Sequence, residues 1–135
     1  MRKTNLKAVF LLSTTALASL GSESLAKTER NGFLSLEQSG VASYYSDKLH
    51  GQRTANGEFY DKNALTAAHA TLPFGSLVRV VNLSNNRSVE LRINSRAHKA
   101  NKRLLDVSKR AASELGFIRA GLAKVKLEVL RFGDA

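Results

Sequence analysis

The sequence predicts a small, mainly β domain with one short helix. One segment near the middle of the chain and one near its end alternate apolar and polar residues, as half-buried strands do, and a neighbouring segment is rich in β-branched residues. Only one segment inside the domain combines a helical apolar spacing with signals for a helix start and stop. The 135 residues, 43% of them hydrophobic, are enough for one compact domain and too few for two. Short strands in so small a domain must avoid open edges, which favours closure into a barrel.

Residues 1–26 have the pattern of a cleaved secretory signal peptide. Arg2, Lys3 and Lys7 form a positive start, and the apolar stretch "AVFLLSTTALASL" that follows is too short to span a bilayer comfortably. Small residues ending at Ala26 suit signal peptidase. A buried N-terminal helix is the alternative. We expect export to the periplasm or cell envelope as a soluble protein, without a lipid anchor because no cysteine follows the apolar stretch.

The first half of the domain is the less clearly patterned half. Residues 27–39 are mostly polar without a clear period, which predicts a linker, and the domain is expected over 40–132. Its first element is a short strand in "GVASYY", residues 40–45. Residues 50–63 are dense in turn formers, and the segment 64–72, "ALTAAHATL", is ambiguous between helix and strand.

The middle of the chain predicts a β-hairpin. "LVRVVNL", residues 77–83, is rich in β-branched residues, and "SVELRIN", residues 88–94, alternates cleanly. Asn85 and Asn86 lie between the two runs, and Asn tolerates the left-handed conformation that tight hairpin turns need. The apolar face of the second strand is expected to consist of Val89, Leu91 and Ile93.

The end of the chain predicts the helix and a last strand. In "SKRAASELG", Ser108 can cap the helix N-terminus and Gly116 suits the position after its end. The strand follows in "LAKVKLEVL", residues 122–130. Its buried face is expected to consist of Val125, Leu127 and Val129.

Composition limits the possible functions. The chain has no cysteine, which excludes disulfides, a thiol nucleophile and thiolate metal sites. In an exported protein, the formal net charge of +10 favours anionic polymers of the envelope or an anionic membrane surface over nucleic acid as partner. A purely solubilising role of the charge is the alternative. His50 and His98 lie at no recognised metal-ligand spacing from His69, so we predict neither a metal nor a cofactor.

Four motifs occur in a specific order and spacing: "TANGE", "LTAAH", "TLPFGS" and "NNRSV". With them, residues 40–130 resemble the rare lipoprotein A (RlpA) family. The resemblance implies a six-stranded double-psi β-barrel, a fold that expansins also use. It further implies an endolytic lytic transglycosylase, which cleaves the bond between N-acetylmuramic acid and N-acetylglucosamine in peptide-poor glycan strands and leaves a 1,6-anhydro ring. Peptidoglycan glycan strands are the partner so implied, and we expect them to be bound by a monomer.

Such cleavage needs a carboxylic acid that protonates the leaving glycosidic oxygen. The sugar's own C6 hydroxyl then closes onto C1, and the same carboxylate can act as its base. The resemblance implies that Glu58, in "TANGE", and His69, in "LTAAH", belong to the site. By residue pattern alone, an exposed turn glutamate and a packed structural histidine are the simpler interpretations.

The third family position departs from the family pattern. The family reads Ile-Asn-Asp-Arg-Gly-Pro-Phe where this chain reads "INSRAHK", so Ser95 stands at the position of the aspartate assigned the main catalytic role. A serine hydroxyl cannot act as a general acid near neutral pH. Asp106 matches the aspartate of the family's Ile-Asp-Leu-Ser element. It is either the surviving catalytic carboxylate or a structural residue that ties the loop to the following helix.

Substrate binding is assigned to the residues around these carboxylates: Tyr45, Thr54, Asn56, Arg96, Lys99 and Arg103. Lys102 and His98 add to the basic loop, which either contacts an anionic polymer or is merely solvated. The tyrosines offer stacking faces to sugar rings or belong to the core. Because of Ser95, a non-catalytic, expansin-like cell-wall binder is the alternative function. Nucleic-acid binding through the basic surface is disfavoured by the export signal.

Overall fold

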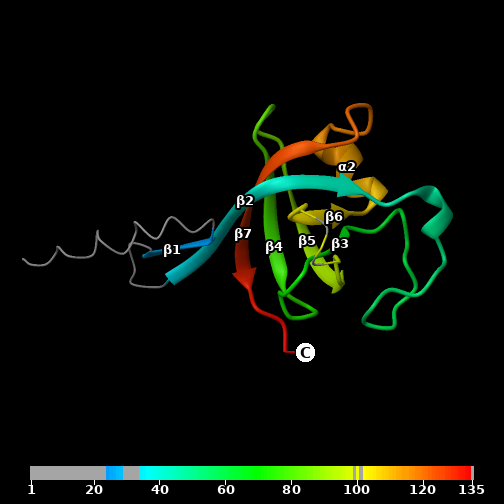
Figure 1. Cartoon of the computed structure of the whole chain (residues 1–135), viewed down its shortest axis with the longest axis horizontal. Coiled ribbons are helices and arrows are strands. Elements are labelled where there is room, and N and C mark those ends of the chain that lie inside the picture. Colours follow the sequence, from blue (N-terminus) through cyan, green and yellow to red (C-terminus); the bar gives the residue numbers. More distant parts are fainter. Residues whose placement is uncertain (1–23, 29–33, 99, 101, 135) are drawn as a thin grey trace, which may run out of the picture.

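The computed structural model describes residues 24–28, 34–98, 100 and 102–134. Its strands form one sheet with the order β1-β2-β6-β3-β5-β4-β7, and β7 also pairs with β2, so that β2 to β7 close into a barrel (Figure 1). This confirms the expected β-barrel. The elements are β1 (Ser24–Thr28), β2 (Leu34–Tyr44), η2 (Asp47–Leu49), β3 (Thr66–Ala68), β4 (Leu77–Asn82), β5 (Ser88–Ser95), β6 (Leu105–Val107), α2 (Lys109–Leu115) and β7 (Ala123–Arg131).

The barrel mixes parallel and antiparallel pairs. The pairs β2–β6 and β3–β5 are parallel, whereas β3–β6, β4–β5, β4–β7 and β2–β7 are antiparallel. The short strands β6 and β3 therefore lie between β2 and β5 in the barrel wall. This arrangement brings the end of β5 and the middle of β6 close together, although they are separated by a loop along the chain.

The expected hairpin, helix and last strand are confirmed. β4 and β5 pair through Val80 and Val89, and Asn86 adopts the positive φ of 62° that the turn requires. The side chain of Ser108 accepts a hydrogen bond from the backbone N–H of Ala111, and Gly116 ends α2 in the left-handed conformation. The core is lined by alternate residues of the long strands and by one face of α2: Val78, Val80, Val89, Leu91, Ile93, Ala111, Ala112, Leu115, Val125, Leu127 and Val129.

The first half of the domain differs from the sequence-based expectation. β2 begins at Leu34, so residues 34–39, which we expected in the linker, are the first part of an eleven-residue strand. Its pairing with β7 runs from Glu37 to Ala42. These residues are mostly polar, so their own sequence does not mark them as a strand. They form one because they pair with β7, which lies at the far end of the sequence. Figure 1 shows this part of β2 extending beyond the barrel, alongside β1.

The ambiguous segment 64–72 contains the three-residue strand β3. All three of its residues are buried, so no alternation marks it as a strand. Most of the expected signal peptide, residues 1–23, lies outside the described residues, and that expectation stays a prediction. In the described part of the chain, no helix is both long enough and apolar enough to cross a membrane.

Candidate functional site

Four residues form a row across the barrel wall. Ser43 of β2 is paired with Asp106 of β6, Asp106 is paired with Ala68 of β3, and Ala68 is paired with Ser95 of β5. Adjacent strands lie about 4.8 Å apart, so the backbones of Asp106 and Ser95 are separated by roughly 10 Å. The tertiary structure thus places Asp106, one of the two expected carboxylates, and the substituted position Ser95 in a single row.

Ser95 lies at the end of β5 and lines an open cavity. Its hydroxyl oxygen accepts a hydrogen bond from the backbone N–H of Ala55 at 3.1 Å and is also a hydrogen-bonding partner of the Tyr45 phenol. Burial raises the pKa of Tyr45 to about 12, so this phenol stays protonated at neutral pH. The cavity is lined by Tyr45, Leu49, Gln52, Arg53, Thr54, Tyr60, Ser95 and Arg96.

Asp106 is held by hydroxyl and guanidinium groups rather than by the helix. The hydroxyl of Ser43 donates a hydrogen bond to its carboxylate, and Arg103 Nη1 in turn donates to Ser43 Oγ at 3.2 Å. The cap of α2 is Ser108, so Asp106 is not the capping residue of this helix. The half-buried Asp106 shares the strand row with Ser95 but is not among the residues that line the Ser95 cavity.

Glu58 is surrounded by hydrogen-bond donors. Arg92 makes a two-pronged contact with its carboxylate at 2.7 and 3.0 Å, and the side-chain amides of Asn94 and Asn56 donate at 3.0 and 3.1 Å. Arg92 and Asn94 are the main reasons that the pKa of Glu58 falls to about 2. A general acid must carry a proton near neutral pH, which Glu58 in this arrangement does not. Thr54 joins the same network, because its hydroxyl donates to Asn56 Oδ1 at 2.7 Å.

His69 is packed inside the protein, only 3% exposed. Its Nδ1 accepts hydrogen bonds from the backbone N–H groups of Thr71 and Leu72, both at 3.1 Å. The proton is therefore on Nε2, which lies 2.8 Å from Gln38 Oε1 and donates to it. Burial, and then the charge of Arg96, lower the pKa of His69 to about 4. The ring is neutral and connects β2 to the loop after β3, as the structural interpretation expects.

A family model described as "Lytic transglycolase" matches residues 37–127 of the chain, more than half of its length. The chain belongs to this family. The match covers the whole row from Ser43 to Asp106 and confirms the resemblance noted from the motifs.

Curated relatives carry the name endolytic peptidoglycan transglycosylase RlpA. The Campylobacter jejuni protein is 50% identical over 96 residues, which cover 71% of this chain and 35% of that protein. The Neisseria meningitidis protein is 48% identical over 108 residues, covering 80% of this chain and 45% of the relative. The Pseudomonas aeruginosa protein is 52% identical over 89 residues, covering 66% and 26%. The chain thus spans less than half of the length of these relatives.

Solved structures support the fold alone. A Streptomyces papain inhibitor matches with a TM-score of 0.57 at 20% identity, over 70% of this chain and 94% of the inhibitor. An expansin from Clavibacter michiganensis matches with a TM-score of 0.58 at 17% identity, over 73% of this chain and 52% of the expansin. Together with the family match, these confirm the six-stranded double-psi β-barrel.

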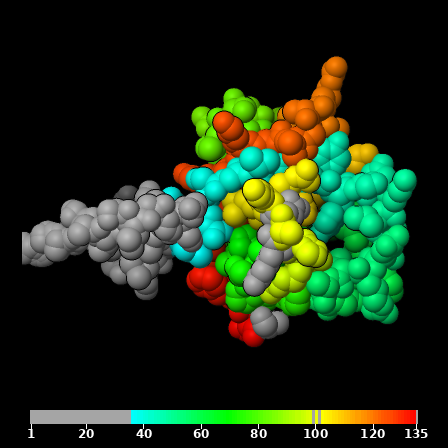
Figure 2. All heavy atoms as spheres, viewed as in Figure 1, coloured from blue at the N-terminus to red at the C-terminus, as the bar shows by residue number. Residues whose placement is uncertain are grey.

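The basic loop of this family member divides into parts with different surroundings. All four described basic residues of the loop are exposed: Arg96, His98, Lys102 and Arg103. Of these, Arg96 lines the Ser95 cavity and Arg103 contacts Ser43. Lys99 lies outside the described residues. Figure 2 shows the segment between β5 and β6, in yellow, at the centre of one face, beside the blue-green segment that follows β2.

Sequence reasoning missed two kinds of site residue. Arg53, Gln52 and Leu49 line the cavity, but they lie in a turn-rich segment whose spacing carries no signal. Arg92 lies on the exposed face of β5, where the local pattern gives it no role. Its pairing with Glu58 joins residues 34 positions apart, which no local pattern reveals.

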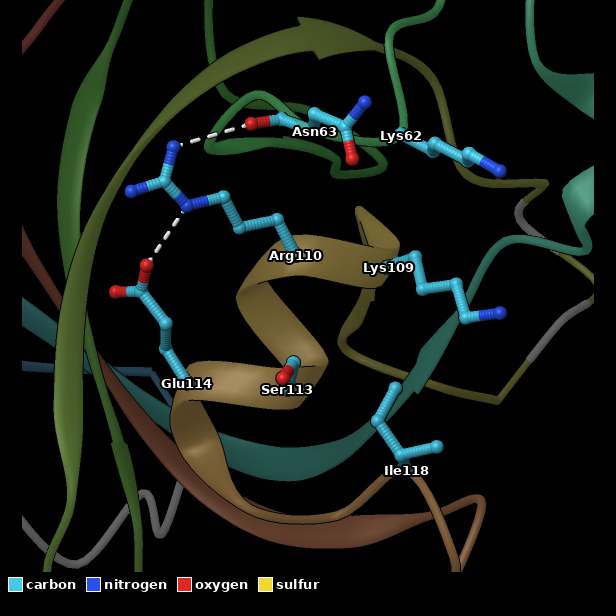
Figure 3. Close-up of a pocket in the computed structure, with 7 residues that line it drawn as sticks. All are labelled: Lys62, Asn63, Lys109, Arg110, Ser113, Glu114 and Ile118. Atoms are coloured by element: carbon cyan, nitrogen blue, oxygen red, sulfur yellow. Dashed lines mark hydrogen bonds and ion pairs between the residues drawn. The ribbon is translucent and has the colours of Figure 1, made fainter.

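A second pocket lies against α2 and contains none of the expected site residues (Figure 3). Three of its four charged lining residues are paired, since Arg110 Nε lies 2.8 Å from Glu114 and Lys109 Nζ lies 2.9 Å from Asp47. Such exposed pairs are typical of a solvated surface. Among the described residues, no group of three or more His, Asp or Glu side chains is placed to hold a metal ion.

Proposed function

We propose that this chain is an endolytic lytic transglycosylase domain. It cleaves the bond between N-acetylmuramic acid and N-acetylglucosamine in peptide-poor peptidoglycan strands and leaves 1,6-anhydro products. The proposal is carried by the placement of Asp106, a half-buried carboxylate that is bonded to Ser43 and lies in the same row of the barrel wall as Ser95. The names of relatives that are about half identical to the domain support it.

In this proposal Asp106 performs both proton transfers. It gives a proton to the glycosidic oxygen as that bond breaks, and it then accepts the proton of the C6 hydroxyl that closes onto C1. Ser43 and Arg103 orient the carboxylate. Glu58 is unsuited to this role because it is held ionised by Arg92, and Ser95 has no useful acidity.

Glu58 and His69 act as positioning residues in the proposal. Glu58 holds the turn that carries Thr54 and Asn56, and His69 holds the loop against which Arg96 rests. Tyr45, Thr54 and Arg96 line the cavity and are proposed to contact the sugar. Lys99 and Arg103 are proposed to contact the same strand further along. We also infer a soluble monomer in the periplasm or cell envelope, without a lipid anchor or nucleic-acid partner.

A non-catalytic glycan binder is the second candidate. It is favoured by Ser95, because the position of the family's main acid carries no carboxylate, and by the fixed ionisation of Glu58. In this case the cavity would bind the strand without cleaving it. The two candidates differ in one measurable product, the 1,6-anhydro end.

The deciding experiment is a digest of purified peptide-free glycan strands, with 1,6-anhydro ends counted by mass spectrometry. We expect wild-type protein to form these ends and Asp106→Asn to form none above background. If wild-type protein at high concentration forms none while it still sediments with insoluble peptidoglycan, the second candidate replaces the first. If it neither cleaves nor sediments, both are wrong.

A further inference from the structure

The cavity beside Ser95 has an unbalanced charge. Two of its lining residues, Arg53 and Arg96, are cationic, and its eight lining residues include no acid. In the described part of the chain, neither arginine forms an ion pair with a carboxylate. Because both arginines line one cavity, their positive charges add there, and the cavity favours a ligand that brings a negative charge.

Both guanidinium groups are held in place by similar contacts. Arg53 lies with its Cζ 4.6 Å from the centre of the Phe59 ring, and its Nη1 donates to the carbonyl of Gly57 at 2.7 Å. Arg96 lies 4.1 Å from the centre of the Phe74 ring, and its Nη1 donates to the carbonyl of His69 at 3.2 Å. Arg96 Nη1 also donates to the carbonyl of Ser95 at 3.5 Å. Stacking and these backbone bonds restrict each side chain before any ligand arrives, which lowers the entropic cost of binding.

The donors needed for a carboxylate remain available. An arginine carries five N–H donors, and the bonds that Arg53 and Arg96 make to described residues use Nη1 alone. The planar guanidinium matches a carboxylate in shape and can bind it with two parallel hydrogen bonds. Ser95, which also lines the cavity, is neutral and does not repel an anion, whereas an aspartate at this position would.

We propose that Arg53 and Arg96 bind a carboxylate carried by the glycan, and that this contact selects sugars with a free carboxylate. The choice of polymer rests on the proposed function. In peptidoglycan strands the carboxylate is the lactyl group of N-acetylmuramic acid. A stem peptide converts this group into a neutral amide, so the arginine pair distinguishes bare from peptide-bearing sugars by charge.

The test compares two forms of one polymer. Peptide-free glycan strands are used as isolated or after conversion of their carboxylates to methylamides, and binding is measured by NMR titration of ¹⁵N-labelled protein. We expect the methylamide to bind wild-type protein about tenfold or more weakly, as the loss of a charge-assisted hydrogen bond predicts. In Arg53→Gln and Arg96→Gln this difference should shrink, and in the double variant it should vanish.

Arg119→Gln is the matched control, because Arg119 is exposed, lies outside the cavity and gives the same change in net charge. Equal binding of both polymers to wild-type protein would overturn the inference, and so would binding of neither. A loss of discrimination in Arg119→Gln as large as in Arg53→Gln would also overturn it, since it would indicate a non-specific charge effect. If the protein discriminates between the two polymers but forms no 1,6-anhydro products, the inference is supported and the proposed activity is wrong.

Discussion

Ser43 donates a hydrogen bond to the carboxylate of Asp106 across the parallel pair of β2 and β6. The two residues are 63 positions apart in the chain. The bond fixes one oxygen of the carboxylate and, with Arg103 on Ser43, holds the group in one orientation. In our proposal this is the orientation in which Asp106 meets the glycosidic oxygen.

Asp106→Asn should therefore abolish cleavage without unfolding the protein. The amide keeps the shape of the side chain but cannot deliver a proton, so we expect a loss of about 10²-fold or more in the rate at which 1,6-anhydro ends appear. Ser43→Ala should give a smaller loss, because the acid remains but is no longer oriented. Thermal unfolding by circular dichroism serves as the control. An Asp106→Asn protein that cleaves at the wild-type rate would show that the acid lies elsewhere.

Ser95→Asp should increase cleavage. The new carboxylate would be placed beside Ala55 and Tyr45, at the position where the resemblance expects the family's aspartate. We expect the rate of 1,6-anhydro formation to rise about tenfold or more, in keeping with the usual contribution of a general acid. Ser95→Asn controls for size, because asparagine has the shape of aspartate without its acidity. The same aspartate should compete with the glycan carboxylate for Arg53 and Arg96, so discrimination against the methylamide should fall.

The ion pair of Glu58 and Arg92 should make part of the stability depend on acid pH. Because the pKa of Glu58 is about 2 in the folded protein and 4.5 in its ordinary state, its contribution is present above about pH 4.5 and is lost as pH falls toward 2. The pair is partly exposed, so we expect Glu58→Gln to lose only about 1 kcal/mol at pH 7. Urea unfolding at several pH values measures this. A difference that persists unchanged at pH 2 would contradict the assignment.

His69 should produce a second pH dependence at higher pH. Its ordinary pKa is 6.5, and burial lowers it to about 4 in the folded protein, so below pH 6.5 the unfolded chain takes up a proton that the folded chain refuses. Stability is thus full above pH 6.5 and falls as pH drops toward 4, by on the order of 3 kcal/mol. His69→Gln, which can keep an acceptor for Thr71 and Leu72, should lack this fall. NMR titration of the His69 ring provides an independent measurement.

Local patterns were sufficient for the second half of the barrel. The alternation of 88–94 and 122–130, the Asn85–Asn86 turn and the Ser108 and Gly116 caps all depend on residues within a few positions of one another. The periodic spacing of side chains and the backbone preferences of single residues act over such short stretches of sequence. The motifs also indicated the family, because their order and spacing are themselves properties of the sequence.

The site was less predictable, because its contacts join distant parts of the chain. The bond of His69 to Gln38 spans 31 positions, and that of Arg92 to Glu58, which keeps the glutamate ionised, spans 34. The early start of β2 likewise depends on its pairing with β7. The sequence by itself determined the residue types available, including the serine at position 95. Only the tertiary structure decided which carboxylate is neutralised by an arginine and which is held by a hydroxyl, since these states follow from groups brought together by barrel closure.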